Sequence, residues 1–174
     1  MARVIIFSRT FPAYHPRAGQ PTYFIEKIWE CLGLPEKEYS FNCPDEYVNY
    51  LRLEKDDIWG KYHTIRTGSR WKAGDKFSPR IWSGKPYRSP QIIIAPDIEI
   101  KQVWDFEIKT AYKELPLDYE ADVIINHRFY HTDDEIMKRL AHNDGLSLAE
   151  LLQWLKYPKP FRGQILCWNE NEKY

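Results

Sequence analysis

The residues best suited to chemistry lie together in the stretch Lys61-Tyr62-His63-Thr64-Ile65-Arg66. A threonine hydroxyl becomes a nucleophile when a neighbouring base takes its proton, and a lysine can be that base if burial or nearby cations lower its pKa. Arg66 would favour that shift and could also stabilise an oxyanion. The alternative is structural, because Thr64-Ile65-Arg66 is equally typical of a plain strand whose arginine pairs with an acid such as Asp144.

The stretch begins a basic and aromatic segment that extends from Gly60 to Pro90. This segment carries eight Lys and Arg residues against a single acid, Asp75, whereas the whole chain has a formal net charge of zero. A local excess of positive charge attracts anions, and aromatic rings among cations are typical of base stacking beside phosphate contacts. The segment therefore predicts binding of a nucleic acid or nucleobase, although a solvated basic surface has the same composition.

A second candidate region is the loop 8–20, which follows a predicted strand and holds two arginines beside hydroxyl groups. Loops at strand ends often carry sites, and an ordinary exposed connection is the alternative. In this hypothesis Trp71, Trp82 or Tyr14 stacks against a base while the cations contact phosphate or polar edges. The candidate ligand-binding residues of the two regions are Arg9, Arg17, His63, Arg66, Arg70, Trp71, Lys72 and Trp82.

Length and composition predict a single domain over residues 1–174, with a helical insertion at about 22–57. A chain of 174 residues with 43% apolar content can bury one core. Its apolar runs are too short to cross a bilayer and its first residues lack the features of a secretory signal, so we expect a cytoplasmic protein. The three cysteines are odd in number and widely separated, which predicts buried thiols rather than a disulfide framework.

The sequence predicts neither a cofactor nor a metal. It has no glycine-rich phosphate loop, which argues against an enzyme acting on nucleoside triphosphates. His127 and His131 are four residues apart, but no matching carboxylate or cysteine set accompanies them.

Hydrophobic periodicity predicts an α+β fold in which several short strands form a small barrel or curled sheet. Strands are expected over 3–7, 64–66, 76–82, 91–95, 99–108, 122–131 and 163–168, and helices over 22–32, 45–53, 132–141 and 148–155. Pro79 suggests that its strand is an edge or carries a bulge. Two capping boxes are expected, one from Thr132 to Glu135 and one from Ser147 to Glu150. The polar tail 169–174 is expected to fray.

The pattern Lys61-x-x-Thr64-Ile65-Arg66, followed by Gly74-Asp75 before a strand, resembles the ASCH domain family of the PUA-like superfamily. Later pieces agree in order, namely Asn143-Asp144-Gly145 before a helix, Trp154-Leu155 within it, and a closing strand that ends at Trp168. The resemblance spans about 61–168, with residues 3–10 as a first strand and the helices between 22 and 53 as elaborations.

The resemblance implies a small PUA-like β-barrel with helices around it and a cleft that binds RNA or nucleobases. Some small members of the family are amidohydrolases that remove the acetyl group from acetylated cytidine. By motif position, their catalytic lysine, threonine and acid fall on Lys61, Thr64 and Asp144. The acid is a glutamate in those enzymes and an aspartate here, and one missing methylene changes the geometry of proton transfer.

Three hypotheses follow from these observations. The favoured one is a module that binds RNA, single-stranded nucleic acid or a modified nucleoside, because the basic and aromatic density exceeds what a small uncharged nucleoside needs. The second is an amidohydrolase that acts on an acylated nucleoside such as acetylcytidine. The third is a protein-interaction domain that docks a partner through the helices between Thr22 and Leu53.

Overall fold

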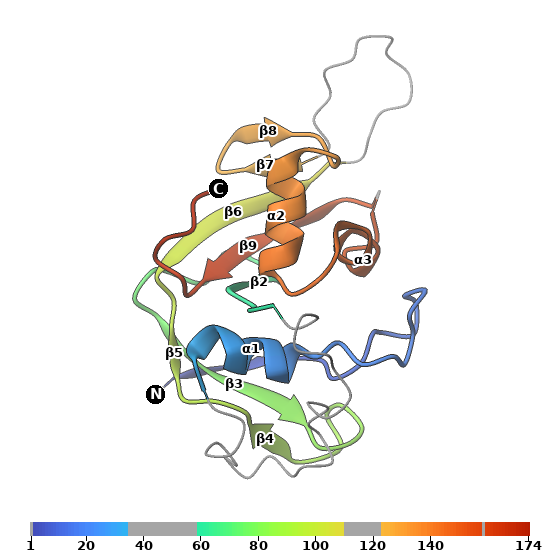
Figure 1. Cartoon of the computed structure of the whole chain (residues 1–174), viewed down its shortest axis with the longest axis vertical. Helices are drawn as coiled ribbons and strands as arrows, with labels where there is room; N and C mark the ends of the chain where they lie inside the picture. The colour runs from blue at the N-terminus through green and yellow to red at the C-terminus, as the bar shows by residue number, and fades with distance from the viewer. Residues whose placement is uncertain (1, 35–58, 110–122, 158) are drawn as a thin grey trace.

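The computed structural model describes residues 2–34, 59–109, 123–157 and 159–174, and its architecture is α+β, as predicted. Within these ranges nine strands form two sheets and are accompanied by three helices (Figure 1). The strands are β1 (Arg3–Ile6), β2 (His63–Thr67), β3 (Lys76–Trp82), β4 (Gln91–Ile93), β5 (Ile98–Glu99), β6 (Gln102–Ile108), β7 (Val123–Ile125), β8 (Arg128–Tyr130) and β9 (Phe161–Cys167). The helices are α1 (Phe24–Leu32), α2 (Glu135–Asn143) and α3 (Leu148–Trp154). The predicted helix 45–53, Cys43 and most of the predicted insertion at 22–57 lie outside the described residues.

The larger sheet is antiparallel, with the order β2-β9-β6-β7-β8, and the smaller one places β1 parallel to β3 with β4 and β5 on the other side of β3. Residues of both sheets belong to one core, in which Phe77 and Ile81 of the smaller sheet cluster with Phe106 and Ile165 of the larger. Within the described ranges no strand pairing closes these sheets into a ring, so the PUA-like barrel stays a prediction.

Two predicted strands are each divided in the structure. The strand expected over 99–108 is interrupted at Ile100 and Lys101, where the chain leaves β5 in the smaller sheet and enters β6 in the larger. The strand expected over 122–131 is a hairpin of β7 and β8, because Asn126 and His127 both have positive φ, at 44° and 68°. A two-residue turn with positive φ matches the twist of paired strands, and asparagine tolerates that conformation well.

Pro79 does not mark a sheet edge, so the edge alternative of that prediction is wrong. β3 has neighbours on both sides, and Pro79 pairs in register with Ile5 of β1. The Pro79 carbonyl accepts a hydrogen bond from Ile94 N–H, so the Pro79 nitrogen also faces the β4 and β5 side of β3. At this point the partner of β3 changes from β5 to β4. Among the described residues, no backbone acceptor of a paired strand is therefore left without a donor because proline lacks an N–H.

The helices mostly begin and end as the sequence predicts. Gly33 ends α1 in the left-handed conformation, and Ser147 and Glu150 form the expected capping box on α3. The capping box predicted from Thr132 is wrong, because Asp134 is the N-cap of α2 and its carboxylate accepts a hydrogen bond from His131 N–H instead.

The tail 169–174 and the loop 8–20 are both held by hydrogen bonds to neighbouring elements. The tail 169–174 does not fray, since Gln102 donates to its backbone carbonyls and the Tyr174 hydroxyl reaches His63. In the loop 8–20, Tyr14 donates to the Trp154 carbonyl and Arg17 pairs with Glu150. Within the described ranges, no helix is both long enough and apolar enough to cross a membrane.

Gly163 of β9 sits where β2 approaches most closely. A Cβ at Gly163 would lie 2.2 Å from the Arg66 carbonyl oxygen, and that oxygen cannot move without distorting β2. We expect Gly163→Ala to lower the free energy of unfolding by about 3 kcal/mol or more. The control is Gly84→Ala, where the nearest atom is a serine side chain at 3.4 Å. Urea denaturation of both variants measures the difference, and equal stabilities would contradict this account of the β2–β9 contact.

Candidate functional site

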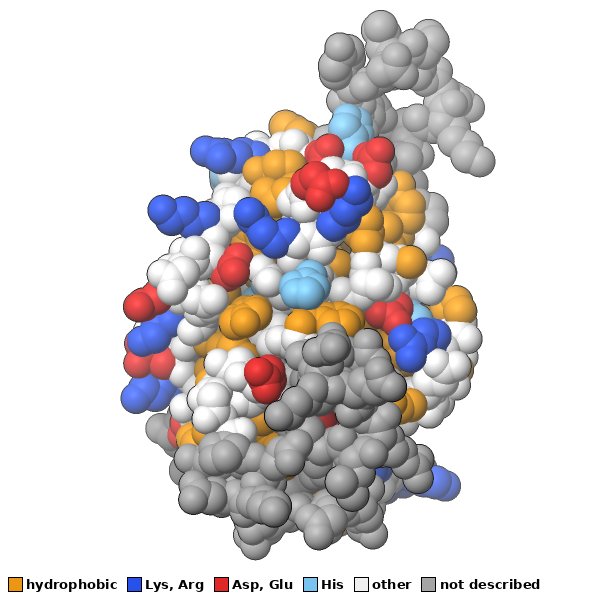
Figure 2. Space-filling view, viewed as in Figure 1, with side chains coloured by type: hydrophobic (Ala, Val, Ile, Leu, Met, Phe, Trp, Pro, Cys, Tyr) orange, Lys and Arg blue, Asp and Glu red, His pale blue; other side chains and the backbone are white. Residues whose placement is uncertain are grey.

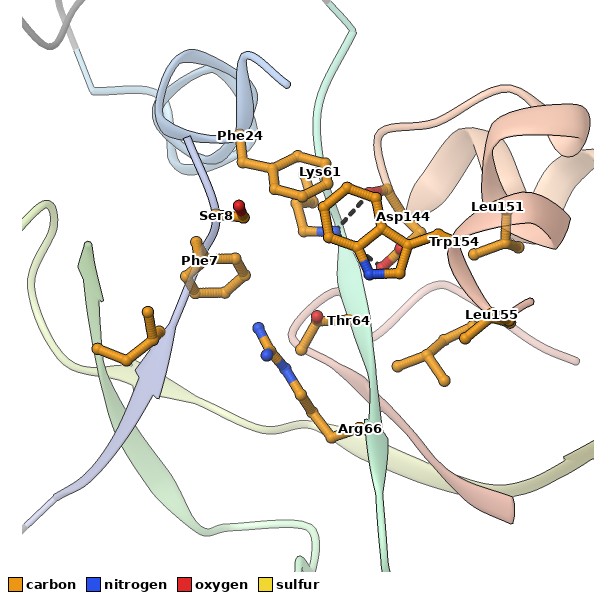
Figure 3. Close-up of a pocket in the computed structure, with 12 residues that line it drawn as sticks. Phe7, Ser8, Phe24, Lys61, Thr64, Arg66, Asp144, Leu151, Trp154 and Leu155 are labelled. Atoms are coloured by element: carbon orange, nitrogen blue, oxygen red, sulfur yellow. Dashed lines mark hydrogen bonds and ion pairs between the residues drawn. The ribbon is translucent and has the colours of Figure 1, made fainter. Parts of the chain in front are cut away.

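A partly enclosed cavity of about 100 Å³ lies between the end of β1, α1, β2 and α3 (Figure 3). Its polar lining comes from Ser8, Lys61, Thr64, Arg66 and Asp144, while the apolar lining includes Phe7, Phe24, Leu151, Trp154 and Leu155. The structure therefore brings together the three residues predicted to be catalytic, although Asp144 is far from the other two in sequence.

Lys61 and Asp144 form a buried ion pair at one side of the cavity. The distance from Lys61 Nζ to Asp144 Oδ1 is 2.7 Å, and Nζ also donates to the Asp144 backbone carbonyl. The Lys61 residue is 1% exposed and Asp144 7%. Burial lowers the pKa of Lys61 to about 8, against the opposing effect of Asp144, and burial likewise raises the pKa of Asp144 above its ordinary value. A lysine so placed can exchange a proton near neutral pH.

Thr64 and Arg66 point into the cavity from β2, because alternate residues of a strand face the same side. Thr64 is 4% exposed and lines the cavity. The Arg66 guanidinium lies over the Phe7 ring at 5.1 Å, and its buried Nε lacks a hydrogen-bond partner within the described part of the chain. Burial lowers the pKa of Arg66 to about 10, and its N–H donors are available to an oxygen of a bound molecule.

Helix ends hold Lys61 and Asp144 in place. Asp144 is the C-cap of α2, and Gly145 then turns the chain with a φ of 80°. A Cβ at Gly145 would lie 3.2 Å from Lys27 Cδ, so glycine suits both the backbone and the space. The backbone N–H of Lys61 donates to the Lys27 carbonyl of α1, and that of Tyr62 donates to the Asn143 carbonyl.

Sequence reasoning missed the cavity's apolar wall. The Phe24 ring lies 4.3 Å from Lys61 Nζ, and the Trp154 indole borders the cavity from α3. The signal available was the apolar stripe of the predicted helix 148–155, in which Leu151 alone is fully buried among the residues that the structure describes there. The remaining apolar side chains on that helix are free to face a cavity.

An open groove of about 370 Å³ adjoins the cavity and shares Ile6, Phe7, Ser8 and Arg66 with it. Its further lining includes Arg9, Trp82 and Tyr87, and the two aromatic rings lie 5.4 Å apart. Arg9 is held by a hydrogen bond to the Ser83 carbonyl. Two of the predicted ligand-binding residues, Arg9 and Trp82, thus border the groove, and Arg66 lies between groove and cavity.

The structure places the other predicted ligand-binding residues elsewhere. Trp71 is a core residue at 3% exposure, so its ring is not presented for stacking. Arg17 is engaged by Glu150, and Arg70 and Lys72 are exposed away from the cavity lining. His63 is fully buried behind Asp144, with 3.9 Å between His63 Nε2 and Asp144 Oδ1. The basic segment therefore does not form one continuous binding surface.

Charge on the visible face is mixed rather than concentrated. Figure 2 shows Lys and Arg side chains spread over this face and interspersed with Asp and Glu. The described residues contain no cluster of three or more His, Cys, Asp or Glu side chains that could hold a metal ion. The two described cysteines are buried or half-buried, and burial raises the pKa of Cys31 to about 11 and that of Cys167 to about 12.

No family model matches this chain, and no curated protein or solved structure was found to be similar to it. The resemblance to the ASCH family consequently rests on the motif residues alone and stays a hypothesis. What the cavity can do must be argued from its own chemistry.

The first test of the ion pair is Asp144→Asn, which leaves a buried ammonium without its anion. We expect the free energy of unfolding to fall by about 3–5 kcal/mol at the low pH where Lys61 is charged in both folded proteins. The Lys61 pKa of about 8 should fall further in the variant, because the ammonium has lost its anion. Above about pH 8 Lys61 is neutral in both folded proteins, so the deficit of the variant should shrink as pH rises toward 8.

Urea denaturation between pH 5 and pH 9 measures this deficit, with Asp75→Asn as the surface control. A second variant, Lys61→Met with Asp144→Leu, removes both charges and should regain most of the lost stability. A deficit that does not change with pH would show that Lys61 is not the group responsible.

Proposed function

We propose that the cavity is the active site of an amidohydrolase that removes a small acyl group from the amide nitrogen of a nucleoside, such as acetylcytidine. The observation that carries this proposal is the buried Lys61–Asp144 pair beside the Thr64 hydroxyl and an Arg66 Nε that has no hydrogen-bond partner among the described residues. A purely structural ion pair has no need of a partly empty cavity next to it. The sequence alone favours binding, and the cavity beside the buried ion pair is what moves our preference to catalysis.

The proposed reaction begins with proton transfer from Thr64 Oγ1 to the neutral Lys61 amine. The hydroxyl oxygen then attacks the acyl carbon, and the carbonyl oxygen becomes an oxyanion that Arg66 N–H donors stabilise. Lys61, now an ammonium, gives its proton to the leaving amine as the C–N bond breaks. A water molecule, deprotonated by Lys61, hydrolyses the acyl ester on Thr64 and restores the hydroxyl.

Asp144 orients Lys61 in this scheme. It accepts two hydrogen bonds from Nζ, through Oδ1 and its backbone carbonyl, and this leaves the lone pair of the neutral amine for the Thr64 proton. The shorter aspartate reaches the lysine directly, because the end of α2 brings its backbone to the cavity. The missing methylene therefore does not separate the acid from its partner.

The volumes fit a small acyl group and a larger leaving group. About 100 Å³ corresponds to roughly three water molecules at liquid volume, which is room for an acetyl group but not for a nucleoside. The adjoining groove of about 370 Å³ can hold the leaving group, and Trp82 and Tyr87 offer rings for stacking against a base.

Loss of the nucleophile or the base tests the proposal directly. We expect Thr64→Ala and Lys61→Ala to lower kcat/KM for acetylcytidine by at least about 100-fold, because each removes a group that takes part in bond making. Thr64→Ser keeps a hydroxyl and should retain measurable activity, and Lys72→Ala is the exposed-lysine control. Chromatography of released cytidine measures the rates, and equal rates in wild type and Thr64→Ala would exclude this mechanism.

The pH dependence supplies an independent check. Lys61 must be neutral to accept the Thr64 proton, and its pKa is lowered to about 8. We expect kcat/KM to rise with pH and to level off above about pH 8. A rate that is flat from pH 6 to pH 9 would show that no group with this pKa acts as the base.

The second candidate function is binding of a nucleobase or short single-stranded nucleic acid without turnover, which the aromatic and basic lining of the groove favours. On this hypothesis Trp82→Ala should weaken binding of an oligonucleotide at least about fivefold, and affinity should fall steeply as salt rises. Fluorescence titration with oligocytidine measures both effects, and Tyr130→Phe serves as the remote aromatic control. Binding that ignores salt and Trp82 would count against this candidate.

A further inference from the structure

A chain of hydrogen bonds lies behind Asp144, on the side away from the cavity. Asn143 Nδ2 donates to the Tyr174 hydroxyl at 2.8 Å, and the Tyr174 hydroxyl lies 2.9 Å from His63 Nδ1. His63 is completely buried, and its ring packs edge-on against that of Tyr174. The proposed reaction uses none of these three side chains.

The donors and acceptors favour one direction for this chain. The Asn143 amide nitrogen can only donate, so the Tyr174 oxygen accepts from it, and the single Tyr174 proton is left for His63 Nδ1. Burial, followed by the charge of Lys61, keeps the pKa of His63 well below its ordinary value, so the imidazole is neutral. A neutral imidazole that accepts at Nδ1 carries its proton on Nε2.

The surroundings of Nε2 agree with that tautomer. Nε2 is buried without a hydrogen-bond partner among the described residues, and the nearest acidic oxygen is Asp144 Oδ1 at 3.9 Å. The Leu140 carbonyl of α2 also faces the imidazole. Both oxygens favour an N–H over a lone pair, whereas the opposite tautomer would point a lone pair at the Asp144 carboxylate.

We propose that Tyr174 and His63 are positioning residues of the site, in which the Tyr174 hydroxyl holds His63 as the Nε2–H tautomer and that N–H faces and stabilises the Asp144 carboxylate bound to Lys61. The effect of this positioning on turnover rests on the proposed function, whereas the His63 tautomer and its effect on the ion pair do not. Among the described residues, the other charged groups near these side chains include Arg66, which acts on Lys61 and Asp144, Arg139 of α2, whose guanidinium lies 5.6 Å from the Tyr174 ring, and Glu172 of the tail.

Removal of the hydroxyl has a defined electrostatic effect. In Tyr174→Phe, His63 Nδ1 loses its donor, and the proton can move to Nδ1, which turns a lone pair toward Asp144. A more negative environment favours the protonated forms of both partners, so the pKa of Lys61 and that of Asp144 rise. We expect the pKa of Lys61 to move upward by on the order of one pH unit. The Phe ring keeps the edge-on contact with Trp104, so packing is largely retained.

The first experiment is NMR of protein labelled with ¹⁵N-histidine, in wild type, Tyr174→Phe and the control Tyr130→Phe. His63→Gln assigns the His63 signals. We expect Nε2–H in wild type and in the control, and loss of the pure Nε2–H state in Tyr174→Phe. An Nδ1–H or doubly protonated His63 in wild type at pH 7 overturns the proposal without any variant, and so does an unchanged tautomer in Tyr174→Phe.

The second experiment follows the ¹³Cε resonance of Lys61 against pH in the same three proteins, with Lys61→Met for assignment. A midpoint that moves to higher pH only in Tyr174→Phe supports the coupling, and coincident titrations overturn it. The pH–rate profile for acetylcytidine should shift in the same direction. If no protein releases cytidine, the proposed function fails, while the tautomer and the Lys61 titration still decide this inference.

Discussion

The buried ion pair between Lys61 and Asp144 is the constraint on which the site depends. Removing two charges from water costs several kcal/mol per ion, and their attraction offsets this only when the geometry is good. Here Lys61 Nζ donates to Asp144 Oδ1 at 2.7 Å and to the Asp144 backbone carbonyl. Among the described residues, no second carboxylate pairs with Lys61. Protonation of the pair is therefore sensitive to any change in its surroundings, which is what a proton-transfer site requires.

Backbone contacts from three elements keep this pair together. The backbone N–H of Lys61, two residues before β2, donates to the Lys27 carbonyl of α1, and that of Tyr62 donates to the Asn143 carbonyl at the end of α2. β2 in turn lies against β9, where Gly163 allows the two backbones to approach. The sheet therefore fixes the direction of Thr64 and Arg66, and the two helices fix the ion pair. Neither layer alone would form the cavity.

The sequence predicted the α+β class, the position of most strands, the glycine end of α1 and the capping box of α3, because each depends on local patterns of apolar, turn-forming or capping residues. It failed where neighbours in space decide. Pro79 fits inside a sheet because neither β4 nor β5 pairs with β3 at that residue. The tail is held in place because the Tyr174 hydroxyl hydrogen-bonds with His63. Helix 45–53 is among the predictions that the described residues do not test.

The candidate site shows the same division. A motif match identified Lys61, Thr64 and Asp144, and the structure brings all three to one cavity. Composition, in contrast, overestimated the basic segment as a surface, because it cannot distinguish a buried tryptophan such as Trp71 from one that faces a groove, such as Trp82. Cations that are adjacent in sequence alternate between the two faces of a strand or lie in turns, so a charge run predicts a binding surface only when its side chains face one way. Arg66 and Arg70 illustrate the point. Arg66 lines the cavity, and its Nε has no hydrogen-bond partner among the described residues, whereas Arg70 is exposed away from the cavity.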